Sequence, residues 1–358
     1  MSTQLDILAL EPFYGGVRKM MLETLIRHSR HRWTVLKLPP RRIERRLTAA
    51  ATWFAEQLTR HWVGSVDLLF TSEALNLASF HRLMPNLARK PAVVYFHANQ
   101  LPPADSRKDE ALHLVNLNTA QAATEVWFNS LFHLRDFLSR ASALVSRHLE
   151  LASRNPMPDI TAKAQLMYPP IQPVDSAQEA AGREVRRGKR VVFVDTRDAD
   201  VRLLNAAFGI LTRRAEKWQF ITVGPVEELS PELPRRTVSE RDEAAQWQAM
   251  RECAVMISTK IGAPCDHYAI WGLAAGCTPV WPHTGVYPEL LPEVLHPHCL
   301  YDGTAIKLAS QMQDIYHVER PSGYEHEQEA ILQRFDPVAA SKAMDQRLEE
   351  LAIINGHR

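Results

Sequence analysis

The chain has 358 residues, of which 46% are hydrophobic and 23% are charged. These values exclude disordered and fibrous proteins, and the length favours two domains of roughly 150 to 180 residues each. The formal net charge of +1 does not by itself indicate a nucleic-acid partner.

From the sequence we expect neither secretion nor membrane spanning. No apolar run approaches the roughly 20 residues that cross a bilayer, and the first residues lack a basic region followed by an apolar segment. We therefore expect a cytoplasmic protein. The cysteines lack the paired short spacing of a zinc ribbon or redox motif, which predicts reduced thiols at Cys253, Cys265, Cys277 and Cys299.

The N-terminal half alternates between strand and helix patterns. Short apolar runs predict strands at 4–10, 33–38, 66–71, 92–96 and 125–128. Amphipathic patterns predict helices at 17–30, 44–61, 73–88, 109–123 and 130–153. Such alternation is typical of a parallel sheet covered by helices on both faces.

The same pattern restarts after residues 171–189, which lack apolar periodicity and indicate a linker. Strands are predicted at 190–194, 219–223, 255–258 and 278–281, and helices at 201–216, 240–252 and 266–275. The expected fold is α/β, with two Rossmann-like, doubly wound domains facing a central cleft. Their predicted limits are 1–170 and 190–320, and the helices of 321–358 either pack across both domains or cap the second.

Glycines follow the first predicted strand. Gly15 and Gly16 lack a Cβ atom, so backbone N–H groups there can approach a phosphate or a sugar; a purely structural tight turn is the alternative. The absence of GxGxxG disfavours a nicotinamide site, and the absence of GxxxxGK[ST] excludes a P-loop.

Polar residues follow two later strands of this half. His97 can shuttle a proton or donate to a substrate hydroxyl, and Asn99 and Gln100 offer donors and acceptors for sugars or bases. Asn129 and Ser130 either cap the next helix or line the cleft. A loop that only stabilises its own turn is the alternative for the first three residues.

Two arginines follow the first strand of the C-terminal half. Arg197 and Arg202 can neutralise a leaving nucleotide diphosphate through bidentate contacts. Salt bridges to Asp198 or Asp200 are the alternative.

A loop and a helix start follow strand 255–258. Gly262 and its small neighbours suit a nucleotide or its phosphates. Asp266 and His267 can form an acid/base pair, although Asp266 is equally well placed to cap the helix.

Basic residues gather in two stretches of the sequence. These are solvated helix faces and a linker, or an RNA-facing surface. The first contains Arg27, His28, Arg30, His31, Arg32, Arg41, Arg42, Arg45 and Arg46, and the second Arg183, Arg186, Arg187, Lys189 and Arg190.

Several of these motifs together resemble a known family. Between residues 5 and 301 the chain is similar to the tRNA-queuosine alpha-mannosyltransferase-like proteins, which are retaining glycosyltransferases of the GT-B fold. The resemblance rests on EPFYGG at 11–16, YFHANQL at 95–101, WFNS at 127–130, YPP at 168–170, ST at 258–259, AAGCTPV at 274–280, YPEL at 287–290 and CLY at 299–301.

The resemblance implies a nucleotide-sugar donor held by the C-terminal domain, with no metal and no further cofactor. The implied donor is GDP-mannose, and the implied acceptor is queuosine in a tRNA. Together with the positions of the polar residues after the strands, this gives His97 and Asp266 as the expected catalytic residues. The expected donor residues are Arg197, Arg202, Gly262 and His267, and the expected acceptor or cleft residues are Glu11, Gly15, Gly16, Asn99, Gln100, Asn129 and Ser130.

The sequence departs from the family pattern at several of these places. Ala98 stands where the family has Glu, and Val17-Arg18-Lys19 replaces Ser-His-Lys. The paired glutamates that bind donor sugar and ribose fall on Ala263 and Trp271. Three possibilities stay open: a transferase with a rearranged donor site, a paralogue with another donor or acceptor, and an inactive nucleotide- or RNA-binding protein.

Overall fold

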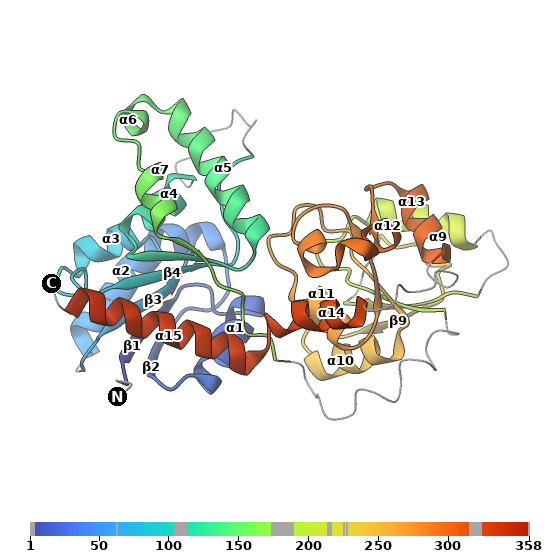
Figure 1. The fold of residues 1–358 in the computed structure, drawn as a ribbon, viewed down its shortest axis with the longest axis horizontal. Coiled ribbons are helices and arrows are strands. Elements are labelled where there is room, and N and C mark those ends of the chain that lie inside the picture. Colours follow the sequence, from blue (N-terminus) through green and yellow to red (C-terminus); the bar gives the residue numbers. More distant parts are fainter. Residues whose placement is uncertain are drawn as a thin grey trace. The chain divides into compact units, whose positions relative to one another are not determined.

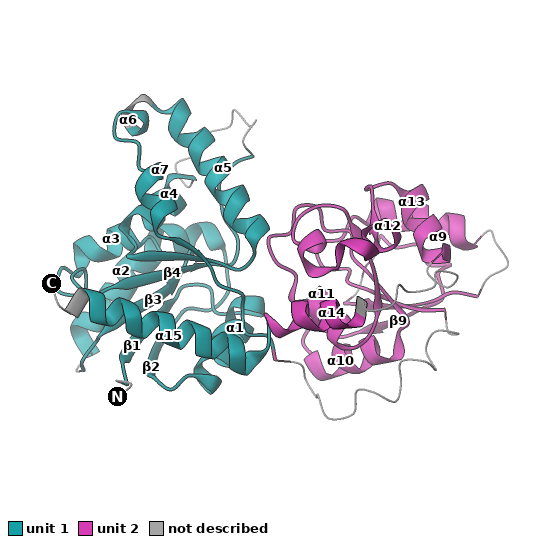
Figure 2. Ribbon diagram, viewed as in Figure 1, with its two compact units in different colours: residues 1–171, 335–358 teal, residues 172–334 magenta. Residues whose placement is uncertain are grey.

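The chain folds into two compact units, each built around one sheet. A computed structural model describes residues 4–61, 64–103, 113–172, 190–212, 217–224, 226, 228–314 and 324–356. Unit 1 comprises Met1–Ile171 and Phe335–Arg358, and unit 2 comprises Gln172–Arg334 (Figure 2). The predicted α/β class with two Rossmann-like units is confirmed.

Unit 1 contains a six-stranded parallel sheet in the order β2-β1-β3-β4-β5-β6. Its strands are β1 Asp6–Glu11, β2 Arg32–Lys37, β3 Leu68–Ser72, β4 Ala92–Phe96, β5 Glu125–Phe128 and β6 Ala164–Leu166. All residues of β3, β4 and β5 are buried. Continuous burial is what helices on both faces of a parallel sheet produce.

Helices cover both faces of this sheet. Phe54, Phe80 and Phe137 belong to the apolar cluster on one face, and Leu25 and Met344 to the cluster on the other. The helices are α1 Gly16–His28, α2 Ile43–His61, α3 Leu77–Leu83, α4 His113–Ala122, α5 Leu131–Arg147, α6 Leu149–Ala152, α7 Met157–Ala162 and α15 Pro337–Gly356.

Unit 2 contains a second six-stranded parallel sheet, in the order β12-β11-β10-β7-β8-β9. Its strands are β7 Val191–Val194, β8 Gln219–Val223, β9 Arg235–Val238, β10 Val255–Ile257, β11 Thr278–Pro282 and β12 Leu300–Tyr301. Its helices are α9 Val201–Thr212, α10 Glu243–Glu252, α11 His267–Ala274, α12 His296–Cys299, α13 Ala305–Asp314 and α14 Tyr324–Gln333, with short 3-10 turns η1 Tyr287–Leu290 and η2 Glu293–Leu295.

Side chains close the first turns of several helices. Asn76 caps α3, Ser130 caps α5 and Asp242 caps α10, each accepting a hydrogen bond from a backbone N–H three residues on. Capping of this kind satisfies donors that have no partner within the helix. It explains why these helices begin directly after polar residues.

The C-terminal helices divide between the units. Helix α14 belongs to unit 2 and contacts α11, whereas α15 returns to unit 1 and packs against α1 (Figure 1). The two C-terminal helices therefore do not both cap the second domain. Of the predicted linker, residues 173–189 lie outside the described part of the chain. Arg190, at its end, lies over the ring of Trp218 at 5.5 Å.

Polar contacts fix α15 to unit 1. Asp345 is buried and accepts hydrogen bonds from the Ser29 hydroxyl at 2.7 Å and the Arg30 N–H at 2.8 Å. Further along α15, Arg347 forms an ion pair with Glu125 of β5. The last helix is therefore an integral part of the first unit.

The strand order marks one position in each sheet where ligands are expected. The order reverses between β1 and β3 in unit 1, and between β7 and β10 in unit 2. In open α/β sheets, ligands bind outside the carboxyl ends of the strands at such a switch point.

Replacing Asp345 should weaken the docking of α15. In Asp345→Ala the Ser29 hydroxyl and the Arg30 N–H, both part-buried, lose their acceptor, which should lower the free energy of unfolding of unit 1 by about 1–3 kcal/mol. Urea unfolding followed by circular dichroism measures this, with Gln346→Ala, an exposed position on the same helix, as control. Equal midpoints for the two variants would contradict the assignment.

Candidate active site

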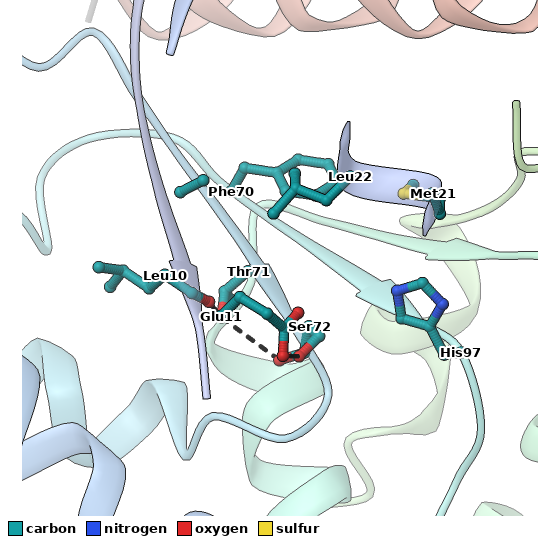
Figure 3. Close-up of a pocket in the computed structure, with 9 residues that line it drawn as sticks. Leu10, Glu11, Met21, Leu22, Phe70, Thr71, Ser72 and His97 are labelled. Carbon is teal, nitrogen blue, oxygen red and sulfur yellow. Dashed lines mark hydrogen bonds between the residues drawn. The ribbon is translucent and has the colours of Figure 1, made fainter. Parts of the chain in front are cut away.

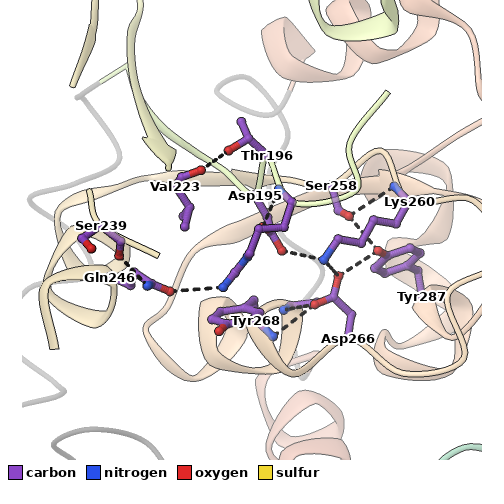
Figure 4. A network of polar contacts seen from close by, with 12 residues as sticks. Asp195, Thr196, Val223, Ser239, Gln246, Ser258, Lys260, Asp266, Tyr268 and Tyr287 are labelled. Carbon is purple, nitrogen blue, oxygen red and sulfur yellow. Dashed lines mark hydrogen bonds and ion pairs between the residues drawn. The ribbon is translucent and has the colours of Figure 1, made fainter. Parts of the chain in front are cut away.

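A buried ion cluster occupies the switch point of unit 2 (Figure 4). Asp195 follows β7 and is completely buried. Its Oδ1 accepts from Arg197 Nε at 2.8 Å, and its Oδ2 accepts from Lys260 Nζ, beyond the end of β10, at 2.7 Å. Burial raises the pKa of Asp195, but Lys260 and Arg197 outweigh this, and the net pKa is lowered. The carboxylate therefore stays ionised and fixes both cations.

Both carboxylate oxygens of Asp266, in the same cluster, accept hydrogen bonds. Its Oδ1 accepts from the N–H groups of Tyr268 and Ala269, and its Oδ2 accepts from the Tyr287 hydroxyl at 2.9 Å. Lys260 Nζ lies 3.7 Å from the same Oδ2. Of the two interpretations of Asp266, the structure therefore shows the helix cap of α11.

His267 does not pair with the Asp266 carboxylate. It is buried, and its Nδ1 lies 4.0 Å from Cys265 Sγ. Burial, with a smaller effect from Lys260, lowers the pKa of His267 to about 4. The imidazole is therefore neutral near pH 7, and the expected acid/base pair is not formed.

The structure separates the two predicted arginines. Arg197 pairs with Asp195, which corrects the expected alternative of Asp198 or Asp200. Its guanidinium also lies over the Tyr268 ring, 3.2 Å from the centroid. Arg202 is exposed on α9. Only Arg197 therefore belongs to the buried cluster.

The two positions at which the resemblance implies glutamates are occupied by side chains without carboxylates. Ala263 is buried, and its backbone carbonyl accepts from Val286 N–H at 2.9 Å. Trp271 is buried against Tyr268, with ring centroids 5.4 Å apart. Gly262 has φ +66, the left-handed region that glycine tolerates, and a Cβ there would meet no atom within 4 Å.

A second buried carboxylate organises the switch point of unit 1. Glu73 follows β3, is 1% exposed and forms an ion pair with Arg18 of α1. Its carboxylate also accepts from the N–H groups of His97 at 3.1 Å and Ala98 at 3.3 Å. Asn116 extends this network, because its amide bridges the Glu73 carbonyl and the Gln100 N–H. Glu73 therefore sets the path of the loop after β4.

Glu11 lines a small pocket together with Ser72 and His97 (Figure 3). Its Oε1 accepts from Phe13 N–H at 2.7 Å and from the Ser72 hydroxyl at 3.0 Å. Burial raises the pKa of Glu11 to about 7, although Arg18 opposes the shift. This side chain can therefore gain or lose a proton near neutral pH.

The remaining predicted residues of unit 1 stabilise the neighbouring loops. Asn129 donates to the His97 carbonyl at 3.0 Å, and Ser130 caps α5. Asn99 accepts from Leu101 N–H and donates to Asp136. These contacts agree with the structural alternatives for Ser130, which caps α5, and for Asn99, which stabilises its own loop. Asn129 is not the cap but bonds to the loop after β4. The ligand roles of all three residues stay predictions.

The glycine pair has two different structural reasons. A Cβ on Gly15 would lie 2.4 Å from Cγ of Pro40, which belongs to the loop between β2 and α2. The close approach of that loop therefore requires glycine at position 15. Gly16 starts α1 with φ +52, and a Cβ on it would meet no atom within 4 Å. The close packing at Gly15 supports the tight-turn interpretation, whereas the free space at Gly16 is compatible with a ligand.

Sequence reasoning missed four charged residues of these clusters: Asp195, Lys260, Glu73 and Arg18. Each carboxylate directly follows a buried strand, at 191–194 and 68–72. An acidic residue in that position must find a cation or remain protonated. This rule could have identified the carboxylates, but not their distant partners.

Within the described residues, no helix is long and apolar enough to cross a membrane. No group of three or more His, Cys, Asp or Glu side chains in that part of the chain could hold a metal ion. The four cysteines lie in the described part and are present as thiols.

Comparison with known proteins relates both sequence and fold to glycosyltransferases. A family model described as tRNA-queuosine alpha-mannosyltransferase N-terminal matches residues 6–171. The tRNA-queuosine alpha-mannosyltransferase of Drosophila melanogaster is 25% identical over 313 residues, which cover 80% of this chain and 82% of that protein.

Solved structures of GT-B enzymes share the fold. HepE from Anabaena, in complex with UDP and glucose, matches with a TM-score of 0.64 and 15% identity, covering 97% of this chain and 100% of that one. Sucrose-phosphate synthase from Thermosynechococcus elongatus matches with a TM-score of 0.65 and 13% identity, covering 98% and 100%. The GT-B fold is thereby confirmed.

Lys260→Met should destabilise unit 2. The substitution leaves the fully buried Asp195 carboxylate with Arg197 as its remaining cation, and breaking a buried ion pair costs about 3 kcal/mol or more. Thermal unfolding measures the loss, with the exposed Lys307→Met as matched control. A melting temperature unchanged from wild type would show that the pair contributes nothing.

Glu11 should make unit 1 less stable as the pH rises. Its folded pKa of about 7 lies above the ordinary value of 4.5, so its contribution is fully present below about pH 4.5 and is lost as the pH rises to about 7. The shift corresponds to roughly 3 kcal/mol. Glu11→Gln removes this loss, so its free energy of unfolding should rise relative to wild type between pH 5 and pH 8.

Urea unfolding across this pH range tests the prediction. The exposed Glu44→Gln serves as control and should run parallel to wild type. A constant difference between Glu11→Gln and wild type at all pH values would refute a titrating Glu11.

Proposed function

We propose that this chain, whose residues 6–171 match the tRNA-queuosine alpha-mannosyltransferase N-terminal model and which is similar to the Drosophila enzyme, is a divergent member of that family and transfers mannose from GDP-mannose to queuosine in a tRNA. The reaction breaks the bond between the anomeric carbon and the diphosphate oxygen. It forms a bond from that carbon to an acceptor hydroxyl, with retention of configuration. The acceptor hydroxyl loses its proton, and the nucleotide diphosphate leaves.

One observation of the structure supports the donor half of this proposal above the others. Arg197 and Lys260 both lie at the switch point of unit 2, held by the fully buried Asp195. Fixed cations stabilise the charge that develops on a departing diphosphate without reorganising during the reaction. Arg202, exposed on the following helix, is available to a more distant phosphate.

The acceptor half rests on the switch point of unit 1. His97 lines the pocket next to Glu11, and Glu73 holds the backbone that presents it. An imidazole next to the acceptor hydroxyl can take up the proton that this hydroxyl loses. We propose His97 for this role and Glu11 for binding an acceptor hydroxyl.

A second candidate function has its own supporting observation. Ala263 and the buried Trp271 cannot bind donor hydroxyls through carboxylates, and Asp266 is committed to its cap and to Tyr287. A site without these groups favours a transferase that uses another sugar. The donor test must therefore include more than GDP-mannose.

The test uses purified protein, queuosine-containing tRNA and a panel of GDP- and UDP-sugars. We expect mannosylated tRNA from GDP-mannose, detected by mass spectrometry of the digested nucleosides. GDP at 100 times its dissociation constant should also stabilise the protein by about 2.7 kcal/mol. The absence of both transfer and nucleotide-induced stabilisation across the panel would reject a transferase.

Arg197→Ala should lower kcat/KM by about 100-fold, since a fixed donor that stabilises developing charge contributes on that order. Arg197→Lys keeps the charge but loses the planar guanidinium, so its kcat/KM should lie between those of wild type and Arg197→Ala. Arg236→Ala, which removes an exposed ion pair of the same unit, is the control. Wild-type kinetics in folded Arg197→Ala would exclude Arg197 from the donor site.

A further inference from the structure

Strand β2 divides the first arginine-rich stretch into two groups with different surroundings. Two arginines at the start of β2, Arg30 and Arg32, lie at the amino end of the sheet and serve the fold. Arg30 pairs with Glu349 of α15 at 2.6 Å, and Arg32 pairs with Asp6 of β1 at 2.6 Å. These cations are already neutralised within unit 1.

The residues after β2 form what we name the basic corner: Arg41, Arg42 and Arg45. All three are exposed and form no ion pair with any residue in the described ranges. Arg46, beside them, donates to the Pro39 carbonyl at 3.0 Å. Glu44 is the single acidic residue between positions 37 and 46. The corner therefore presents positive charge to solvent.

The basic corner is attached to the loop that follows β1. Leu38 N–H donates to the Glu11 carbonyl at 3.0 Å, and Tyr14 N–H donates to the Leu38 carbonyl at 2.9 Å. Pro40 packs directly against Gly15. The corner thus lies at the carboxyl edge of the sheet, the edge at which His97 leaves β4.

Strand order gives the distance between the corner and the candidate acceptor pocket. β2 is the edge strand and is separated from β4 by β1 and β3. Three strand spacings amount to roughly 14 Å. A few nucleotides of an RNA strand span such a distance, so one RNA can reach both places.

The corner is unfavourable for the protein alone. Arg41, Arg42 and Arg45 surround the N-terminus of α2, where the helix dipole already places positive charge and cations destabilise. Arg42 also has φ 50, a backbone conformation that non-glycine residues rarely adopt. An anion bound at this place would relieve the repulsion.

We propose that the basic corner binds the phosphodiester backbone of the RNA that carries the acceptor nucleoside. This inference rests on the proposed function for its choice of partner. Arginine forks bind phosphate oxygens in pairs, and such contacts fix the position of a nucleic acid without reading its bases. The corner holds the strand while the pocket at Glu11 and His97 receives the nucleoside.

The test compares two triple variants. Arg41→Ala/Arg42→Ala/Arg45→Ala removes the corner. The control, Arg27→Ala/Arg89→Ala/Lys90→Ala, removes three exposed cations that form no ion pair with a described residue. These cations lie near the amino ends of the strands, opposite the corner. Binding of an unmodified tRNA transcript is measured by fluorescence anisotropy from 50 to 300 mM salt. The melting temperature of each variant checks its fold.

Removing the corner should weaken binding near 0.1 M salt by about 100-fold and reduce the slope of log K against log salt by about 2. The control variant should bind like wild type, and the corner variant should melt at or slightly above the wild-type temperature. Equal affinity of the corner variant and wild type would overturn the proposal. So would equal losses in both variants, or a wild type that binds phosphatidylserine vesicles but not tRNA.

The same proteins separate this proposal from the proposed function. GDP-dependent stabilisation needs no RNA and should be unchanged in the corner variant. If wild type binds the transcript through the corner but transfers no sugar, the RNA surface stands and the proposed reaction fails. If wild type transfers mannose to tRNA and the corner variant does so with an unchanged KM for tRNA, the reaction stands and the surface fails.

Discussion

The buried carboxylate of Asp195 is the constraint on which the C-terminal unit depends. An ionised carboxylate without solvent costs several kcal/mol unless cations and hydrogen bonds replace the water. Arg197 and Lys260 supply both, one from the loop after β7 and the other from the loop after β10. The pairing joins the two strands at which the sheet order reverses. Unit 1 repeats the solution with Glu73 and Arg18 between β3 and α1.

This pairing also determines what the cations can do. Arg197 is held by Asp195 on one side and lies over Tyr268 on the other, so its guanidinium has little freedom to move. A group fixed in this way loses little entropy when it binds a phosphate, which is the advantage of preorganised electrostatics. Under the proposed function, the carboxylate that stabilises the fold therefore also holds the cations in place for the diphosphate.

The sequence predicted most of the elements but not the contacts between charged groups. The strands at 92–96, 125–128 and 219–223 were predicted with their observed limits because they are short apolar runs. Strand β9, with three of its four residues exposed, has no such run and was missed. The contacts between charged groups span 65 positions for Lys260 and Asp195, and no local pattern reports a pairing over that distance. Gly15 shows the same limit, since its clash partner Pro40 lies in another loop.

The packing of the Asp195 cluster also gives a reason for the tryptophan at position 271. Trp271 stands where a carboxylate is expected and packs against Tyr268, the ring over which the Arg197 guanidinium lies. A carboxylate at position 271 would put a charge next to this aromatic support, where burial makes an unpaired charge costly. Position 271 can therefore hold either the aromatic ring that supports Tyr268 and Arg197 or a carboxylate for the donor hydroxyls, but not both. With tryptophan there, donor recognition under the proposed function depends more on the charge of the diphosphate than on the hydroxyls of the sugar.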